Sequence, residues 1–179
     1  ELTDTQNITV TVLAVNDAPV ASTDIIGETN EDQSIAITLS GSDIDGDNLT
    51  FSLDSDATNG SITVEGTLAT YTPNADYNGD DSFSFTVTDG ELSDSAIITL
   101  TINAVNDAPI LATVLDVYFD EDNSNSISLS GSDIDEDSLT FSITEGSDII
   151  AILDENDVTF SAPTNFNGSE EFTITLNDG

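Results

Sequence analysis

The segment Asn103-Ala104-Val105-Asn106-Asp107-Ala108-Pro109 lies between two stretches of similar sequence and decides how the chain is divided. Almost the same segment, Ala14-Val15-Asn16-Asp17-Ala18-Pro19, precedes the first stretch, 90 residues earlier. Its proline lacks a backbone donor and pushes the preceding alanine towards an extended conformation, so neither copy can become helical. A short acidic segment that recurs once per repeat is expected to be a junction between domains.

The sequence on the two sides of the junction repeats with an offset of 90 residues. Gly41-Ser42-Asp43-Ile44-Asp45 returns as Gly131-Ser132-Asp133-Ile134-Asp135. We therefore expect one repeat over residues 16–105 and a second over residues 106–179 that lacks its last strand. Because Glu1-Leu2-Thr3-Asp4 matches Glu91-Leu92-Ser93-Asp94, residues 1–15 are interpreted as the last strand of a preceding or neighbouring repeat.

Alternation of apolar and polar residues predicts short β-strands along the whole chain. Ile8, Val10 and Val12 alternate with threonines, which predicts a half-buried strand. Turn signals such as Asn59-Gly60 separate the runs. About seven short strands per repeat predict an all-β fold, with tandem Greek-key β-sandwiches of immunoglobulin-like type. Further alternating runs cover residues 35–39, 49–53, 62–64, 68–71, 83–87 and 98–102.

The charge of the chain predicts a cation partner. The chain has 36 acidic residues and no lysine, arginine or histidine, so its formal charge is −36 and no side chain can form a salt bridge. Like charges crowded on a small domain oppose compaction, and oxygen ligands suit Ca²⁺. The alternative is that the acidity provides only solubility.

The composition also excludes several classes of function. Phosphate would be repelled, so no nucleic-acid partner is expected. No apolar run approaches the length of about 18 residues that suggests a membrane span, so none is expected in this segment. Without cysteine, histidine or lysine the chain lacks thiolate zinc ligands, the commonest general base and the Schiff-base nucleophile, and we expect no enzymatic activity.

Acidic residues gather near the predicted ends of each repeat, where they could bind Ca²⁺. The base of the first repeat is expected to present Glu31, Asp32, Asp89 and Glu91 to the linker residues Asn106 and Asp107 and to Asp133, Asp135 and Asp137 of the following repeat. Alternate residues of an extended segment point the same way, so the last three can converge on one ion. The remaining candidate ligands are Glu1, Asn16, Asp17, Asp43, Asp45, Asp47, Glu121, Asp122 and Asp178.

These motifs resemble those of cadherin repeats, and more closely those of the bacterial cadherin-like tandem repeats of giant surface adhesins. The resemblance rests on Glu31 and Glu121, on Asp89-Gly90-Glu91, on Asn106-Asp107 and on Asp133-Ile134-Asp135. The family has one more aspartate in the linker, where this chain has Ala104. The resemblance implies a cadherin-like sandwich with Ca²⁺ at the junctions, which would turn a flexible string of domains into a stiff rod.

The sequence thus predicts a secreted or cell-surface calcium-binding structural repeat of an extracellular adhesin or fibre, with a role in surface attachment or biofilm. Adjacent repeats of the same protein are the expected partners, and a homopolymer, a surface polysaccharide or a cell surface stay open. One alternative is a self-assembling fibre subunit joined by donor-strand exchange of residues 1–15. Another is a carbohydrate- or partner-binding module, which an exposed cluster of Tyr71, Tyr77 and Tyr118 would favour.

Overall fold

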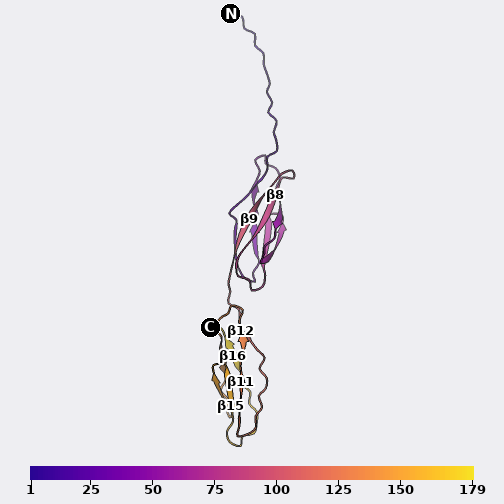
Figure 1. Ribbon diagram of the computed structural model, residues 1–179. Coiled ribbons are helices and arrows are strands. Elements are labelled where there is room, and N and C mark those ends of the chain that lie inside the picture. Colours follow the sequence, from indigo (N-terminus) through magenta and orange to yellow (C-terminus); the bar gives the residue numbers. More distant parts are fainter. The chain divides into compact units, whose positions relative to one another are not determined.

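The computed structural model describes all residues from 1 to 179, and the chain contains sixteen β-strands and no helix (Figure 1). It divides into a first unit, Glu1–Val105, and a second unit, Asn106–Gly179. The predicted all-β class is confirmed, and no helix is present that could cross a membrane.

Two sheets form the sandwich of the first unit. The larger sheet has the order β2-β9-β8-β5, and the smaller has the order β3-β7-β6. β2 runs parallel to β9, and all other neighbours are antiparallel. The strands are β1 (Val20–Ala21), β2 (Ile26–Asn30), β3 (Ile35–Thr38), β4 (Gly41–Ser42), β5 (Thr50–Ser55), β6 (Gly60–Glu65), β7 (Leu68–Pro73), β8 (Gly79–Thr88) and β9 (Ser93–Asn103), and β1 pairs with β4.

The core of the first unit lies between these two sheets. Phe83 and Phe85 of β8 and Ile98 of β9 are fully buried, as is Tyr71 of β7 from the other sheet. Successive strand residues point to opposite faces, so the apolar half of each alternating run is the half that faces the core. The runs at 83–87 and 98–102 are thus confirmed as strands with the predicted inner face.

The second unit repeats this plan with a smaller core. Its sheets have the orders β11-β15-β14 and β13-β16, and β10 pairs with β12. Only Leu129, Val158 and Phe160 are fully buried hydrophobic residues here. The strands are β10 (Ile110–Leu111), β11 (Ser124–Ser128), β12 (Gly131–Ser132), β13 (Thr140–Ile143), β14 (Ile150–Asp154), β15 (Asp157–Ser161) and β16 (Ile174–Asn177).

Two predictions about strands were wrong. Residues 1–15 form no strand, and Ile8 and Val12 are 86% and 90% exposed, because no segment of the chain supplies the hydrogen bonds that a strand needs. Conversely, β2 was not predicted, because its sequence Ile-Gly-Glu-Thr-Asn does not alternate. Its structure depends on the parallel pairing with β9, which no local pattern records.

Candidate metal sites

A loop of aspartates follows β4 at one end of the first unit. The Asp43 carboxylate organises it, because its Oδ1 accepts hydrogen bonds from the backbone N–H of Asp45 at 2.9 Å and of Asp47 at 3.3 Å. Gly46 has a φ of 80°, which favours glycine, and allows the loop to close. One carboxylate oxygen from each of Asp43, Asp45 and Asp47 then lies within 4.8 Å of the others.

The segment that enters the first unit is bound to this loop and to the turn between β8 and β9. The backbone N–H of Asp17 donates to Oδ2 of Asp45 at 2.8 Å, and the Asn16 amide donates to Oδ2 of Asp89 at 2.9 Å. Hydrogen bonds from the backbone N–H groups of Leu92 and Glu91, and then from Asn16, hold the pKa of Asp89 below its ordinary value. Asp89 is therefore ionised at neutral pH and adds its charge to this end of the unit.

The second unit contains the same arrangement, offset by 90 residues for most of its parts. Oδ1 of Asp133 accepts from the backbone N–H of Asp135 at 2.9 Å and of Asp137 at 3.3 Å. The backbone N–H of Asp107 donates to Oδ2 of Asp135 at 2.8 Å, and the Asn106 amide donates to Oδ2 of Asp178 at 2.8 Å. Carboxylate oxygens of Asp133, Asp135 and Asp137 again lie within 4.8 Å of one another.

One carboxylate oxygen in each cluster is buried without a hydrogen bond. Oδ2 of Asp43 and Oδ2 of Asp133 are both shielded from solvent and have no donor. A buried carboxylate oxygen without a partner is costly, and the neighbouring groups are acids that cannot donate when ionised. A cation would satisfy both oxygens. Ca²⁺ fits best, because it takes about six to eight oxygen ligands with flexible geometry and accepts carboxylates and amide carbonyls together.

The opposite end of the first unit presents a second group of acids. Glu31 follows β2, is buried, and accepts a hydrogen bond on Oε1 from the backbone N–H of Val105. Oδ1 of Asp32 accepts from the backbone N–H of Asp76 at 3.3 Å. Asp32 and Asp76 have φ of 58° and 55°, an unusual backbone conformation for residues with a side chain.

The predicted grouping of Asp89 and Glu91 with Glu31 and Asp32 was wrong. β8 and β9 are hairpin neighbours, so their turn lies where β8 ends and β9 begins. β2 runs parallel to β9 and ends beside Asn103, at the other end of β9. Asp89 consequently lies next to Asn16 rather than Glu31. Glu91 contributes its backbone N–H to Asp89, and its side chain is exposed, as is that of Glu1.

Sequence reasoning missed Asp76, which takes the place beside Asp32 that had been assigned to Asp89. A signal for it exists in the second unit, where the backbone N–H of Asn165 donates to Oδ1 of Asp122 at 3.1 Å. Asp76 and Asn165 each precede a repeated aromatic-Asn-Gly sequence, and both have positive φ. Glu121, the counterpart of the buried Glu31, is exposed, because the second unit has no strand that leads to a residue like Val105.

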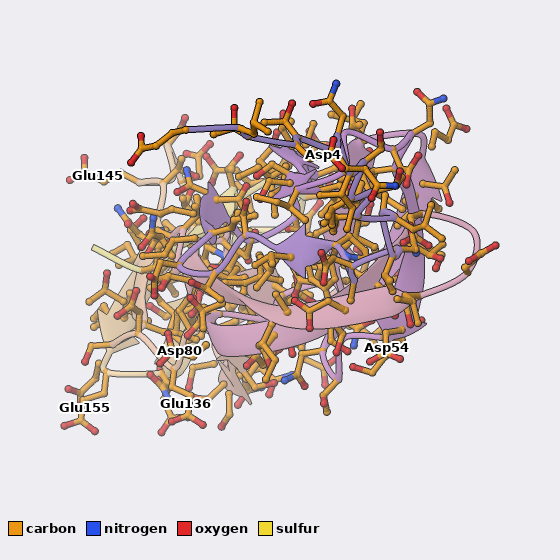
Figure 2. All side chains as sticks on the ribbon, turned by 90° about the horizontal axis from the view of Figure 1, so that it is seen from above. Asp4, Asp54, Asp80, Glu136, Glu145 and Glu155 are labelled. Carbon is orange, nitrogen blue, oxygen red and sulfur yellow. The ribbon has the colours of Figure 1, made fainter.

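The tyrosines do not form an exposed aromatic cluster. Tyr71 lies in the core, and its hydroxyl donates to Oδ2 of Asp81 at 3.1 Å. Tyr77 packs against the same core and donates to the Asp80 carbonyl at 2.7 Å. Only Tyr118 is largely exposed, and the feature that would favour a carbohydrate-binding module is absent. Other acids, such as Glu136, Glu145 and Glu155, point away from the ribbon (Figure 2).

Two acid-lined, repeated sandwiches of this kind define an immunoglobulin-like or cadherin-like tandem module. The family model of the bacterial Ig domain matches residues 16–101 and 106–179, and the chain belongs to this family. The predicted relationship to bacterial cadherin-like repeats is consistent with both this family and the structural neighbours below. Comparison with curated protein sequences finds no match.

Solved cadherin ectodomains have a similar structure. Drosophila N-cadherin EC1-4 matches with a TM-score of 0.62 and 20% identity, over 91% of this chain and 46% of that one. Human protocadherin-24 EC1-2 matches with a TM-score of 0.58 and 17% identity, over 90% of this chain and 86% of that one. At these identities the likeness shows the fold alone.

An endo-fucoidan hydrolase of glycoside hydrolase family 107 also matches, with a TM-score of 0.45 and 24% identity, over 90% of this chain and 27% of the enzyme. That score is too low to support an argument about activity. Immunoglobulin-like and cadherin-like folds are typically structural rather than catalytic. The chain thus spans between about a quarter and about half of the larger proteins it matches.

Proposed function

We propose that this chain is a calcium-binding structural segment of an extracellular adhesin or surface fibre. Its clusters at Asp43–Asp47 and Asp133–Asp137 each hold Ca²⁺. The ion binds the segment that enters the unit and so limits the motion of one unit relative to the next. The proposal places the protein outside the cell, where calcium concentrations match the weak sites of extracellular modules, with Kd of about 10⁻⁴–10⁻³ M.

The observation that carries this proposal is the pair of buried, unpartnered oxygens Asp43 Oδ2 and Asp133 Oδ2. Each belongs to a cluster whose oxygens already converge. The duplication supports a binding role, because two loops of the same sequence reproduce the same hydrogen bonds within the two units. Acids that served only solubility would be spread over the surface and would have no reason to converge.

The linker residues give this binding a mechanical consequence. The backbone N–H of Val105 is bound to Glu31 within the first unit. The next two residues are bound within the second unit, Asn106 to Asp178 and Asp107 to Asp135. Few backbone bonds are therefore free to rotate between the two attachments. Calcium on Asp135 and its neighbours would strengthen the second attachment, and loss of calcium would loosen it.

Calorimetric titration with Ca²⁺ tests the proposal, with Asp43→Asn and Asp133→Asn each expected to abolish binding in its own unit only. Asp154→Asn is the matched control, because it removes one charge from an exposed strand position without a cluster. At calcium concentrations ten times the Kd, each site should stabilise the protein by about 1.4 kcal/mol, measured by urea unfolding with and without chelator.

Small-angle X-ray scattering of the same samples tests the mechanical part. The chain should scatter as a stiff rod with calcium and as a flexible pair of units with chelator, and Asp133→Asn should resemble the chelated form. If sodium chloride or Mg²⁺ produces the same binding heat and the same stiffening as Ca²⁺, the acids act only through screening and the proposal fails.

A further inference from the structure

The second unit has an open sheet edge that the first unit lacks. In the first unit β9 lies between β2 and β8 in a four-stranded sheet. In the second unit the corresponding sheet contains only β13 and β16, and no strand of the chain pairs with residues 116–120, the counterpart of β2. β16 is four residues long, whereas its counterpart β8 has ten.

An apolar groove runs along this open edge. It has a volume of about 380 Å³, and its lining includes Val117, Phe119, Phe172 and Ile174. Leu115 and Tyr118 beside it are 78% and 80% exposed. An unpaired edge with an apolar surface readily accepts a strand from another chain, because the strand supplies both the missing hydrogen bonds and the missing side chains.

Residues 1–15 have the sequence of the strand that would fill this groove. In the first unit β9 covers the corresponding surface with Ile98, Leu100 and Ile102, which are 0%, 2% and 3% exposed. Ninety residues earlier stand Ile8, Val10 and Val12, with the same spacing and exposures of 86%, 78% and 90%. The chain therefore carries both an open groove and an unpaired strand with a matching pattern.

Side-chain size supports the same register. In the first unit Gly27 pairs with Leu100, and a Cβ on Gly27 would lie 2.7 Å from Cδ2 of Leu100. The second unit has Val117 in place of Gly27, so a leucine at the matching position of the added strand would collide with it. At the same offset of 90 residues, that position in the N-terminal segment is Val10, and valine lacks the Cδ2 atom.

We infer that residues 1–15 of one copy of this chain bind as a β-strand in the open groove of the second unit of another copy. The strand lies parallel to residues 116–120, with Val10 opposite Val117 and Thr11 opposite Tyr118, and antiparallel to β16. Because each copy provides one strand and one groove, the contact is head-to-tail and generates open chains of molecules. Each copy carries a charge of −36, so the association needs counterions and strengthens with salt or calcium.

The first experiment measures the mass of the full chain by light scattering over a wide range of protein concentrations, in moderate salt with calcium. The mass should rise well above the 18.8 kDa of one copy. Val10→Asn should weaken the association at least about tenfold, because it places an amide in the apolar groove. Thr11→Asn is the matched control, since Thr11 points to the opposite face and introduces the same side chain.

A disulfide experiment tests the register directly, because the protein has no cysteine of its own. Thr11→Cys combined with Tyr118→Cys should give a ladder of covalent oligomers under oxidising conditions. Thr11→Cys combined with Ser126→Cys, which lies on the other sheet, should not. A synthetic peptide of residues 1–15 should compete with the strand and suppress the ladder.

Three results would overturn this inference. The chain might stay at the mass of one copy at every concentration, with or without calcium. The cysteine pair Thr11→Cys and Tyr118→Cys might close only within single molecules, so that the strand fills the groove of its own chain. Oligomers that form equally well in wild type and Val10→Asn would show association through another surface.

Discussion

Tyr71→Phe should remove most of the sensitivity of this protein to alkaline pH. Tyr71 is fully buried, and its hydroxyl donates to Oδ2 of Asp81 at 3.1 Å. Burial first, and then the hydrogen bond and charge of Asp81, raise the pKa of Tyr71 well above its ordinary value of 10.0. In the unfolded chain both causes vanish and the pKa returns to about 10.

The sign of the effect follows from proton binding. Above about pH 10 the unfolded chain loses the Tyr71 proton while the folded chain keeps it, so rising pH favours the unfolded state. The stability that the buried hydroxyl contributes is fully present below pH 10 and is lost at about 1.4 kcal/mol per pH unit above it. Between pH 10 and pH 12 the folded state should therefore lose about 2.7 kcal/mol through this one group.

This chain suits the measurement because it has no lysine, arginine, histidine or cysteine, so its three tyrosines are the only side chains that titrate at alkaline pH. Urea unfolding at a series of pH values, with tyrosinate absorbance recorded in parallel, would compare wild type, Tyr71→Phe and the control Tyr118→Phe. Tyr118 is 80% exposed. Tyr71→Phe should cost about 1–1.5 kcal/mol near neutral pH, where it removes one hydrogen bond.

The decisive quantity is the slope of stability against pH above pH 10. Tyr71→Phe should flatten it by about 1.4 kcal/mol per unit, and Tyr118→Phe should leave it close to that of wild type. Equal slopes in wild type and Tyr71→Phe would refute the reasoning, because Tyr71 would then ionise as easily in the folded state as in the unfolded chain.

Three further predictions concern the first unit. Gly27→Val should destabilise it by about 1–3 kcal/mol through collision with Leu100, and Leu100→Val in the same chain should recover part of that loss, whereas strict additivity in urea unfolding would contradict the packing argument. Glu31→Ala should cost about 1–3 kcal/mol without calcium, because it leaves the Val105 N–H without its acceptor, while Glu31→Gln and the exposed counterpart Glu121→Ala should change stability by less than about 0.5 kcal/mol; equal losses for Glu31→Ala and Glu121→Ala would argue against the buried contact. Burial raises the pKa of Asp81, but hydrogen bonds from Asn59, Ser82, Thr58 and Tyr71 outweigh it and hold the pKa below its ordinary value; the stability from this group is thus present above about pH 4 and lost as pH falls, so the acid limb of unfolding should be shallower in Asp81→Asn than in wild type, and an unchanged limb would contradict the assignment.

The features that could be read from the sequence are those that depend on neighbours along the chain. A strand buries every second residue, so the alternation at 83–87 and 98–102 identified both the strands and their inner faces. The Asp43–Asp47 loop is local as well, because its hydrogen bonds join residues two and four positions apart. The same loop in the second unit could therefore be predicted from its sequence alone.

Positions that depend on sheet topology could not be obtained in this way. The sequence around Asp89-Gly90-Glu91 does not record at which end of a sandwich that turn lies. The hairpin of β8 and β9 placed Asp89 beside Asn16, and the loop after β7 brought Asp76 to Asp32. These contacts join residues far apart in sequence, and no periodicity in either segment encodes them.

The sequence by itself determined that this chain is built from two acidic all-β repeats whose loops gather carboxylates, because period and composition are local properties. Only the tertiary structure decided which carboxylates meet, since strand pairing sets which loops share an end. It also decided which apolar strand is buried. Ile98, Leu100 and Ile102 lie in a core, while the similar Ile8, Val10 and Val12 are exposed, because a strand is buried only where a neighbouring strand and a facing sheet are present to receive it.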